Sequence, residues 1–374
     1  MLKIVNVVGA RPNFMKMAPI VDAMKVYPRE IQQTLVHTGQ HYDEKMSKSF
    51  FVDLGIPEPD LNLEVGAGSH AQQTAGVMVA FEKVCLDIKP DLVIVVGDVN
   101  STMACTITAK KLGVKVAHVE AGLRSRDMAM PEEINRLCTD VISDYLFTTD
   151  ERANANLKSE GVDENKIHFV GNVMIDTLLK HKEKAAALPF AHWGLNKGDY
   201  ATVTLHRPSN VDDKQTLQGI LEALHEIAQH IKVVFPMHPR TRKMVNQFNL
   251  SHLLTDDLSK PDIYTVEPLG YLEFLRLNMD AKMVLTDSGG LQEETTVLGI
   301  PCITLRHNTE RPITCDVGTN VIVGNDKRKI LAAAKSVLDG TAKRGGVPDR
   351  WDGKAAERIV EILIGLEKKI KTPL

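Results

Sequence analysis

Short, uninterrupted apolar runs recur along the chain, and each is followed by a longer segment with the apolar spacing of a helix. A run that is apolar at every position predicts a strand buried on both faces, and such strands are typical of parallel sheets whose connections are helices. The pattern therefore predicts an α/β fold built of βα units. With 374 residues, the chain is long enough for two domains of ordinary size.

The expected strands form two series, one on each side of an Ala-, Lys- and Pro-containing stretch at residues 184–190. The first series is 4–8, 33–37, 92–96, 114–119, 145–148 and 167–170, and the second is 201–205, 232–236, 263–266, 283–286 and 302–305. Segments such as 214–229 and 291–298 are long enough to be crossover helices. We therefore expect an N-terminal domain over 1–172 and a C-terminal domain over 173–374, with a last helix over 353–370 that could pack on either one.

Both series begin with the same kind of turn. The first strand leads into Gly-Ala-Arg-Pro-Asn at residues 9–13, and the strand that ends at Leu205 leads into His-Arg-Pro-Ser-Asn at 206–210. A proline near the first position of a helix is common in unrelated turns, so the likeness by itself leaves repetition and chance open. If it is repetition, the chain contains two Rossmann-like domains that face each other.

Composition and charge indicate which binding partners and which cellular compartment to expect for this protein. The formal net charge of −3 is unlike that of the clearly basic domains that bind nucleic acid, so we expect no nucleic acid as a partner. The five cysteines are scattered without a Cys-x-x-Cys pair, which favours a reducing compartment over a disulfide framework or a zinc cluster. No run approaches the roughly 20 apolar residues of a membrane span. We therefore expect a cytoplasmic protein with no membrane partner.

Polar residues that follow expected strands are the first candidates for a site, because open parallel sheets bind ligands at the carboxyl ends of their strands. The segment Asp287-Ser288-Gly289-Gly290 follows one strand and precedes an expected helix. Its small residues would let a phosphate approach the backbone N–H groups at the helix N-terminus. The alternative is that Ser288 only caps the helix.

Several cations lie in loops or first helical turns, where they could grip a diphosphate through charge-assisted hydrogen bonds. They are Arg11, Lys16, Arg136, His206, Arg207 and Arg311. Each of them could equally be an ordinary solvated cation at the surface. Only their convergence on one ligand would distinguish the two cases.

Four carboxylates stand near the same expected strand ends. They are Asp98, Glu120, Glu132 and Glu133. A phosphate ligand repels carboxylates, so these groups gain nothing beside one unless they handle protons. The alternative is structural: Asp98 would cap the helix that follows it, and the two adjacent glutamates would lie in the first turn of a helix that begins after Pro131.

Two further patterns carry less weight. Gly-Ala-Gly-Ser-His-Ala at residues 66–71 matches a dinucleotide fingerprint in its letters, but no clear buried strand precedes it. His37 and His41 are four residues apart, yet a turn separates them and no zinc motif accompanies them. We therefore expect neither a nicotinamide cofactor nor a metal.

Six segments occur in an order that matches one known enzyme family. They are Gly-Ala-Arg-Pro at 9–12 with Lys16, Gly-Asp at 97–98, His-Val-Glu-Ala-Gly-Leu-Arg at 118–124, Pro-Glu-Glu-Ile-Asn-Arg at 131–136, Thr-Asp-Ser-Gly-Gly-Leu-Gln-Glu-Glu at 286–294 and Thr-Glu-Arg-Pro at 309–312. With these segments the chain resembles the non-hydrolysing UDP-N-acetylglucosamine 2-epimerases. The resemblance extends from the first strand to about Pro312.

The resemblance implies a glycosyltransferase-B-like fold of two Rossmann-like domains around a cleft, with the C-terminal helix crossing back. It also implies reversible conversion of UDP-GlcNAc to UDP-ManNAc. In that reaction, anti elimination of UDP gives a 2-acetamidoglucal, and UDP then adds back. No net redox change occurs, so the resemblance implies no cofactor, and it suggests a homodimer.

The resemblance also implies roles for single residues. Asp98, Glu120 and Glu132 would be the acid and base groups, and Asp98 and Glu132 would be the groups that move the C2 proton. The departing diphosphate would be stabilised by a set of cations comprising His206, Arg11, Arg136 and Arg311, with Lys16 near the Arg11 loop. The remaining UDP contacts would be Ser288, Gly289 and Gly290 to phosphate, Glu294 to the ribose hydroxyls and Phe274 to uracil.

The chain departs from the family's pattern at three places. His206 is followed by Arg-Pro-Ser-Asn where many bacterial members have a carboxylate in the loop. Residues 40–46 keep the family's Gln-His pair but lack the Arg and Gln that follow it, and His-Pro-Arg-Thr at 238–241 also differs. These differences make activation by a second UDP-GlcNAc doubtful. Three other functions stay open: a glycosyltransferase of the same architecture, a hydrolysing epimerase and a catalytically idle sugar-nucleotide sensor.

Overall fold

The computed structural model describes residues 1–39, 55, 57–189 and 194–371, apart from the side chain of Arg11. The chain divides into two compact units. Unit 1 comprises residues 1–180 together with 349–374, and unit 2 comprises residues 181–348. The last segment of the chain therefore belongs with the N-terminal part.

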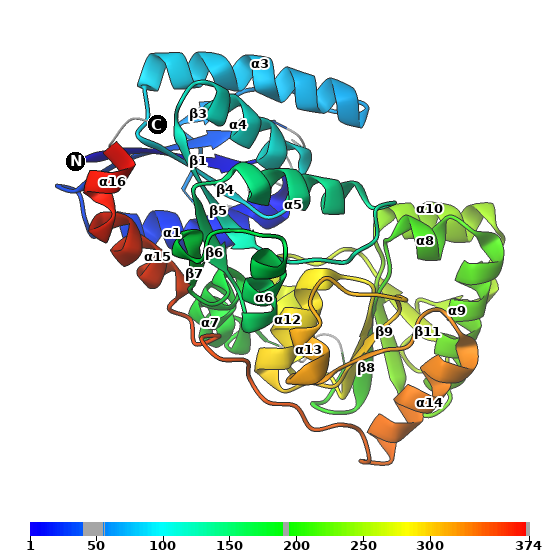
Figure 1. Ribbon diagram of the computed structural model, residues 1–374. Coiled ribbons are helices and arrows are strands. Elements are labelled where there is room, and N and C mark those ends of the chain that lie inside the picture. The colour runs from blue at the N-terminus through cyan, green and yellow to red at the C-terminus, as the bar shows by residue number, and fades with distance from the viewer. Residues whose placement is uncertain (40–54, 56, 190–193, 372–374) are drawn as a thin grey trace. The chain divides into compact units, whose positions relative to one another are not determined.

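Unit 1 is built on a sheet whose described strands are all parallel and lie in the order β3-β2-β1-β4-β5-β6-β7 (Figure 1). The strands are β1 (Leu2–Val8), β2 (Ile31–His37), β3 (Leu61–Asn62), β4 (Leu92–Val96), β5 (Lys115–Ala121), β6 (Tyr145–Thr148) and β7 (Ile167–Phe169). Every residue of β4 is buried, as its uninterrupted apolar sequence predicts.

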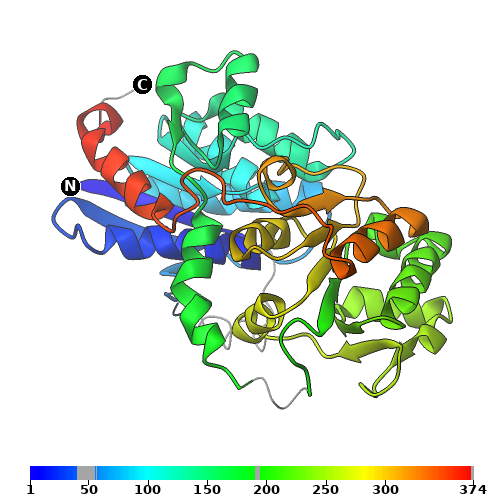
Figure 2. The ribbon, with the colours of Figure 1, turned by 90° about the horizontal axis from the view of Figure 1, so that it is seen from below.

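Helices cover both faces of this sheet. They are α1 (Arg11–Met24), α3 (His70–Ile88), α4 (Asn100–Lys111), α5 (Pro131–Ile142), α6 (Glu151–Ser159), α7 (Val173–Ala186), α15 (Ala355–Gly365) and α16 (Glu367–Lys371), with the short 3-10 turn η1 (Glu164–Lys166). Residues of α3 and α4 share one hydrophobic core with β1, β2, β4 and β5. On the other side, α15 packs beside α1, which Figure 2 shows from below.

Unit 2 repeats the plan with a second parallel sheet in the order β10-β11-β9-β8-β12-β13-β14. Its strands are β8 (Tyr200–Thr204), β9 (Lys232–Pro236), β10 (Leu254–Thr255), β11 (Ile263–Val266), β12 (Met283–Thr286), β13 (Cys302–Thr304) and β14 (Asn320–Ile322). Its helices are α8 (Pro208–Val211), α9 (Lys214–Ala228), α10 (Pro239–Gln247), α11 (Tyr271–Met279), α12 (Gly289–Leu298), α13 (Ile313–Asp316) and α14 (Lys327–Leu338), with the 3-10 turn η3 (Ser251–Leu253).

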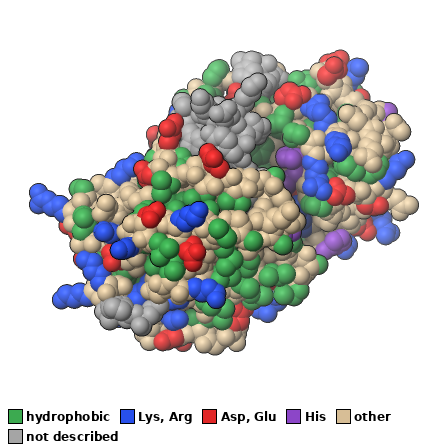
Figure 3. Space-filling view, turned by 90° about the horizontal axis from the view of Figure 1, so that it is seen from above, with side chains coloured by type: hydrophobic (Ala, Val, Ile, Leu, Met, Phe, Trp, Pro, Cys, Tyr) green, Lys and Arg blue, Asp and Glu red, His purple; other side chains and the backbone are tan. Residues whose placement is uncertain are grey.

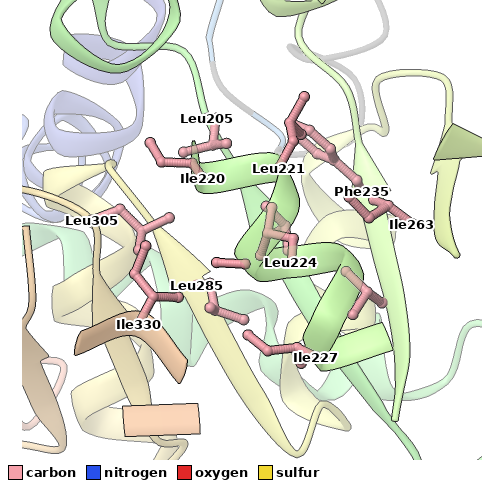
Figure 4. Close-up of a cluster of buried hydrophobic side chains, with 14 of the residues drawn as sticks. Leu205, Ile220, Leu221, Leu224, Ile227, Phe235, Ile263, Leu285, Leu305 and Ile330 are labelled. Atoms are coloured by element: carbon pink, nitrogen blue, oxygen red, sulfur yellow. The ribbon is translucent and has the colours of Figure 1, made fainter. Parts of the chain in front are cut away.

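The core of unit 2 is a cluster of aliphatic and aromatic side chains between the sheet and helices α9 and α14 (Figure 4). Leu224 of α9 and Phe235 of β9 are both completely buried in it. Helices α11 and α12 contribute to a second cluster that includes Tyr200 and Val284. Both faces of the sheet are thus covered, as the α/β pattern predicts.

Each sheet has a point where the strand order reverses. In unit 1 the chain runs outward from β1 to β2 and then returns to β4, and in unit 2 it runs outward from β8 to β9 and then returns to β12. Ligands of open α/β sheets bind at such points, beyond the carboxyl ends of the strands. The loops that follow β1 and β4, and those that follow β8 and β12, are therefore where the fold predicts a site.

The likeness between residues 9–13 and 206–210 has a structural counterpart. Asn13 donates from Nδ2 to the carbonyl oxygen of Val96 at the end of β4. Asn210, at the matching place, donates to Asp287, which follows β12, and to the carbonyl oxygen of Leu305. In each unit an asparagine in the first turn ties the switch-point loop to a neighbouring strand, which favours repetition over chance.

Some expected elements differ from the observed ones. The strands β3, β10 and β14 were not predicted, because each has only two or three residues and includes exposed or half-buried positions. The expected last helix over 353–370 is two helices, α15 and α16, that meet at Leu366.

None of the helices in the described part of the chain is long and apolar enough to cross a membrane. On the face in Figure 3, acidic and basic side chains are interspersed.

Candidate active site

Glu120 sits on a distorted turn at the end of β5. The register between β5 and β6 shifts between Val119 and Ala121, and Glu120 has a φ of +72°. A left-handed backbone costs a residue other than glycine of order 1–3 kcal/mol, and such strain gathers at functional sites. Glu120 is left out of the β5–β6 pairing at this shift, and such irregularities are common beside active sites.

Lys16 is the partner of Glu120. Its ammonium, carried by α1, forms an ion pair with Oε2 of Glu120, and the two side chains are only 8% and 3% exposed. Gly97 makes room for this pair: a Cβ there would lie 3.2 Å from Lys16 Nζ and 3.9 Å from Glu120 Oε2. Lys16 therefore meets a carboxylate, and it stabilises the ionised form of Glu120.

Asp98 is held by Arg136. The Arg136 guanidinium donates from one Nη to Asp98 Oδ2 and, from Nε and the other Nη, to Glu133 Oε2 at 3.0 and 2.6 Å. Arg136 is completely buried, whereas the Asp98 side chain is 25% exposed. The N-cap of α4 is Val99, so the alternative that Asp98 caps this helix is wrong.

Glu133 completes this arrangement. Burial raises the pKa of Glu133, but the backbone N–H of Ser125 and the Arg136 guanidinium outweigh it and hold the pKa below its usual range. The N–H of Arg126 also donates to it, at 2.8 Å. Glu133 is therefore an ionised, fully engaged structural group that fixes Arg136.

Glu132 has different surroundings from the other carboxylates. It lies half-buried in the first turn of α5, which begins at Pro131 as the structural alternative requires. Among the described residues it has no hydrogen-bonding or ion-pair partner. Whereas Asp98 and Glu120 each face a cation, Glu132 is left open to a ligand.

His206 and Asp287 meet at the switch point of unit 2. Asp287 is completely buried, and one of its oxygens lies 2.9 Å from His206 Nδ1. The backbone N–H groups of His206 and Arg207 donate to the same carboxylate at 3.0 and 2.9 Å. The His206 side chain is 42% exposed, so the ring is anchored on one side and accessible on the other.

The segment after Asp287 has the features of a phosphate site. Ser288 is the N-cap of α12, but its hydroxyl makes no capping hydrogen bond. The capping alternative therefore accounts for the place of Ser288 at the helix start but not for a hydroxyl there. Gly289 is in close contact with other groups: a Cβ there would lie 2.6 Å from an Arg311 Nη and 2.8 Å from a Glu310 oxygen. Glycine thus lets charged side chains pack against the start of a helix whose N-terminus favours anions.

Arg311 is fixed by two buried carboxylates. It contacts Glu293 at 2.8 Å and Glu310 at 2.5 Å. Glu310 also binds Arg306 at 2.8 Å and lies 3.7 Å from Arg207. Burial raises the pKa of Glu310, but Arg311 and Arg306 outweigh it and hold the pKa well below its usual range. The carboxylates thus fix the orientation of the cations beside the α12 N-terminus.

Glu294 and Phe274 lie on α12 and α11. Glu294 is buried, and the Tyr271 hydroxyl donates to it at 3.2 Å. Burial raises the pKa of Glu294 to about 7, and the charge of Glu293 adds to this effect. Phe274 is half-buried and packs against the hydrophobic cluster of α11 and α12. A ligand hydroxyl that donates to Glu294 would favour its ionised form.

Comparison with known proteins decides the family. The model of the UDP-N-acetylglucosamine 2-epimerase family matches residues 25–364. A relative from Methanocaldococcus jannaschii, named UDP-N-acetylglucosamine 2-epimerase, is 45% identical over 97% of this chain and 99% of its own length. The chain belongs to the UDP-N-acetylglucosamine 2-epimerase family.

Other members of the family are also similar to this chain. The solved structure of the M. jannaschii UDP-GlcNAc 2-epimerase in complex with UDP-GlcNAc and UDP has a TM-score of 0.88 at 45% identity, covering 97% of this chain and 99% of that one. A relative from Pseudomonas aeruginosa is 42% identical over 98% of this chain and its full length, and its name is UDP-2,3-diacetamido-2,3-dideoxy-D-glucuronate 2-epimerase. The two-sheet α/β fold expected from the family resemblance is confirmed.

In this family member, sequence reasoning missed a buried network beneath the carboxylates of unit 1. Asp140 accepts from Arg124 Nη at 2.7 Å and from the N–H of Gly122 at 3.0 Å, and it lies 2.6 Å from His118 Nδ1. The other ring nitrogen of His118 is 2.8 Å from the carbonyl oxygen of Gly97. The network therefore links the turn that carries Glu120 to the one that carries Asp98. Asp140 lies one helical turn after Arg136, and this spacing was the only signal for it.

Sequence reasoning also passed over the buried carboxylates of unit 2 as separate functional groups. Asp287 was noted only as the first residue of the tetrapeptide, and Glu310 only as part of a matching segment. A strand followed at once by a carboxylate was the available signal. The partners of Asp287 lie on the turn that follows β8, so the sequence did not indicate what it binds. Glu310 binds Arg306 and Arg311 on its own loop.

The remaining sequence candidates lie elsewhere. Arg11 begins α1, and its side chain is outside the described part of the chain. His37 is buried beside Phe14, with ring centroids 5.1 Å apart, and His41 lies outside the described residues. The dinucleotide-like letters lead into Ser69, which caps α3 through its side chain. Within the described residues, no group of three or more His, Cys, Asp or Glu is arranged for a metal.

Proposed function

We propose that the chain catalyses the reversible C2 epimerisation of UDP-GlcNAc to UDP-ManNAc. One observation carries the proposal: the two carboxylates that face cations, Asp98 and Glu120, lie at the switch point of one unit, while the N-terminus of α12 lies at the switch point of the other. Epimerisation of a UDP-sugar requires groups that move a proton and groups that bind a diphosphate. The names of the relatives agree with this substrate.

The charge partners suggest a division of labour among the carboxylates. Arg136 and Lys16 form ion pairs with Asp98 and Glu120, which suits a base and a group that stabilises positive charge. Glu132 has no described cationic partner, so its surroundings differ from those of Asp98 and Glu120. We therefore assign the movement of the C2 proton to Asp98 and Glu132, with Glu120 beside the sugar.

The reaction balances without an oxidant. A carboxylate removes the C2 proton while the bond from C1 to the diphosphate oxygen breaks, and the electron pair of the C–H bond forms the C1–C2 double bond of a 2-acetamidoglucal. UDP then adds back to C1 as a carboxylic acid delivers a proton to the opposite face of C2. No electrons leave the substrate, so the step needs no redox cofactor.

The UDP moiety would be held by unit 2. Ser288, Gly289 and Gly290 would bind phosphate at the α12 N-terminus, and His206 and Arg311 would stabilise the charge that develops on the leaving diphosphate. Glu294 would accept from the ribose hydroxyls and Phe274 would contact uracil. Arg11 is proposed for the diphosphate as well.

Arg136 is proposed to serve the substrate through Asp98. Its guanidinium already binds Asp98 and Glu133, and it is completely buried. Removing it would leave both carboxylates without their counter-charge, so its loss would act on the state of the base more than on UDP affinity.

Incubation in deuterated water tests the proposal. With UDP-GlcNAc and no added nicotinamide or metal, we expect UDP-ManNAc carrying deuterium at C2. Asp98→Asn and Glu132→Gln should abolish the label while UDP still binds. Protein that binds UDP but gives no C2 label would refute the mechanism. Transfer of the sugar to an acceptor would indicate a glycosyltransferase instead, and free ManNAc a hydrolysing epimerase.

A second candidate substrate is a modified UDP-HexNAc. The observation that favours it is the P. aeruginosa relative, whose printed name specifies a 2,3-diacetamido uronate and whose identity to this chain is 42%. Running the same exchange experiment with UDP-2,3-diacetamido-2,3-dideoxy-glucuronate alongside UDP-GlcNAc decides between them by the ratio of the kcat/KM values. The homodimer and the cytoplasmic location stay predictions.

A further inference from the structure

Among the described residues, all the hydrogen bonds to the Asp287 carboxylate come from one short turn. Its oxygens receive the backbone N–H of His206 at 3.0 and 3.2 Å, the N–H of Arg207 at 2.9 Å and the Asn210 amide at 3.3 Å, and one of them lies 2.9 Å from His206 Nδ1. All four donors belong to residues 206–210, which follow β8. Asp287 itself follows the neighbouring strand β12.

The hydrogen bonds of this turn do not require a charged acceptor at position 287. The two backbone N–H groups and the Asn210 amide could be satisfied by a neutral oxygen acceptor, and a completely buried carboxylate carries a large desolvation cost. The imidazole ring is the only one of the four donors whose own charge state responds to a negative partner. Burial raises the pKa of Asp287, but the hydrogen bond and charge of His206 outweigh it and keep the pKa below its usual range.

The surroundings of the ring favour the same state. Besides Asp287, the ring faces His238, the N-cap of α10, with ring centroids 6.0 Å apart. His238 Nδ1 accepts the N–H of Arg240, so that nitrogen carries no proton. Burial, with the charges of His206 and Arg240 adding to it, lowers the pKa of His238. His238 therefore stays neutral and does not compete for the charge. The cations Arg207, on the same turn, and Arg240, on α10, also lie nearby.

The free side of the ring lies where the leaving group is expected. Asp287 holds Nδ1, and the side chain is 42% exposed, so part of the ring is accessible from solvent. Asp287 is followed directly by Ser288, the N-cap of α12 that is proposed to bind the diphosphate. An N–H directed at the oxygen on which charge develops lowers the barrier because it is already oriented when the bond breaks.

We propose that Asp287 is a positioning residue that holds His206 as an imidazolium, with Nδ1–H directed to the carboxylate and Nε2–H directed to the diphosphate oxygen that leaves C1. The role rests on the proposed function. In the elimination, the electron pair of the C1–O bond passes to that oxygen, and the imidazolium stabilises the charge through its hydrogen bond without giving up its proton. Asp287 keeps the proton on the ring.

The first test compares Asp287→Asn with Thr204→Val. Thr204 bonds to Thr286 across the same two strands at 2.6 Å, and neither residue binds the ring, so Thr204→Val controls for strand packing. For Asp287→Asn we expect kcat to fall at least about 100-fold, because an amide can donate to Nδ1 and so favour a ring that has no proton there. The Kd for UDP should change less than about threefold. The alkaline limb of the kcat profile should move to lower pH, because the variant lacks the negative partner of the ring.

A double-mutant cycle separates positioning from stability. In a His206→Gln background, Asp287→Asn should cost less than about threefold in kcat, because the residue acts through the ring. If the loss is the same with and without His206, and the alkaline limb does not move, Asp287 is only structural and the proposal is overturned.

A measurement on the unaltered protein covers the case in which Asp287→Asn does not fold. In protein with 15N-labelled histidine, the His206 resonances, assigned from their disappearance in His206→Gln, should show both ring nitrogens protonated at the pH of maximal activity. An unprotonated Nδ1 or Nε2 there would refute the proposal. This measurement needs no turnover, so a failure of C2 exchange in the wild type, which would refute the proposed function, is a separate result.

Discussion

The buried pair Lys16 and Glu120 gives the sharpest prediction about stability. Replacing Lys16 by Met keeps the length of the side chain and removes the ammonium, which leaves the Glu120 carboxylate buried without that cation. Breaking such a pair typically costs about 3–5 kcal/mol. The carboxylate can avoid part of this cost by taking up a proton.

Proton uptake sets an upper limit that depends on pH. A glutamate of an unfolded chain titrates near pH 4.3, and holding it protonated costs about 1.4 kcal/mol for each pH unit above that value. The limit is therefore about 4 kcal/mol at pH 7 and about 1 kcal/mol at pH 5. Because the folded variant would bind a proton that the unfolded chain has lost, its stability should fall as the pH rises.

Trp351 provides the assay. Its indole is buried in unit 1 and donates to the carbonyl oxygen of Thr149 at 2.9 Å. The chain's other tryptophan is Trp193, so urea unfolding followed by fluorescence in a Trp193→Phe background reports on unit 1. Lys16→Met should lower the free energy of unfolding by up to about 4 kcal/mol at pH 7 and by about 1 kcal/mol at pH 5.

Two controls make this prediction refutable. Lys180→Met removes a half-exposed partner of Asp22 in the same unit and should cost less than about 1 kcal/mol. The double variant Lys16→Met with Glu120→Gln should recover most of the loss, because no buried charge remains. If Lys16→Met costs the same at both pH values, or if the double variant is no better than the single one, the reasoning is wrong.

Three other changes have defined outcomes. Because burial raises the pKa of Glu294 to about 7, the free energy of unfolding of the wild type should fall between about pH 4.5 and pH 7. Glu294→Gln should remove this fall, so the variant should be roughly 3 kcal/mol more stable than the wild type above pH 8. The same variant should bind UDP more weakly in calorimetry. Gly97 has a φ of +70° and lies against the Lys16 ammonium, so Gly97→Ala should lower kcat far more than UDP affinity, and equal losses would contradict this. Leu224→Ala should cost about 2–5 kcal/mol in urea unfolding because Leu224 is completely buried, whereas the 55%-exposed Leu86 should cost little when replaced.

The strands were the most predictable part of the fold. The expected ranges 92–96 and 283–286 coincide with β4 and β12, because strands buried on both faces leave an uninterrupted apolar run in the sequence. The short strands β3, β10 and β14 leave no such run. The break between α15 and α16 at Leu366 was missed because the apolar spacing continues across it.

The sequence motifs predicted which charged residues belong to the site, but they did not predict the ion pairs that these residues form. The motifs indicated Arg136 as a cation for the diphosphate, while the structure has its guanidinium on Asp98 and Glu133. Lys16 was expected near the Arg11 loop, and the structure pairs it with Glu120. The Arg136–Asp98 and Lys16–Glu120 pairs each join a helix to the end of a strand distant in sequence, so these side chains meet only after the sheet has formed. Glu133 lies three residues before Arg136 on the same helix.

The sequence by itself determined the α/β class, the two series of strands and the loops in which chemistry is expected, because apolar periodicity and strand ends are local properties. The tertiary structure decided which charges neutralise one another, why Glu120 adopts a left-handed backbone and which carboxylate, Glu132, is left without a described cation. The physical reason is that electrostatic energy depends on distance and burial. Both are fixed by the register of strands and the packing of helices, which no single segment contains.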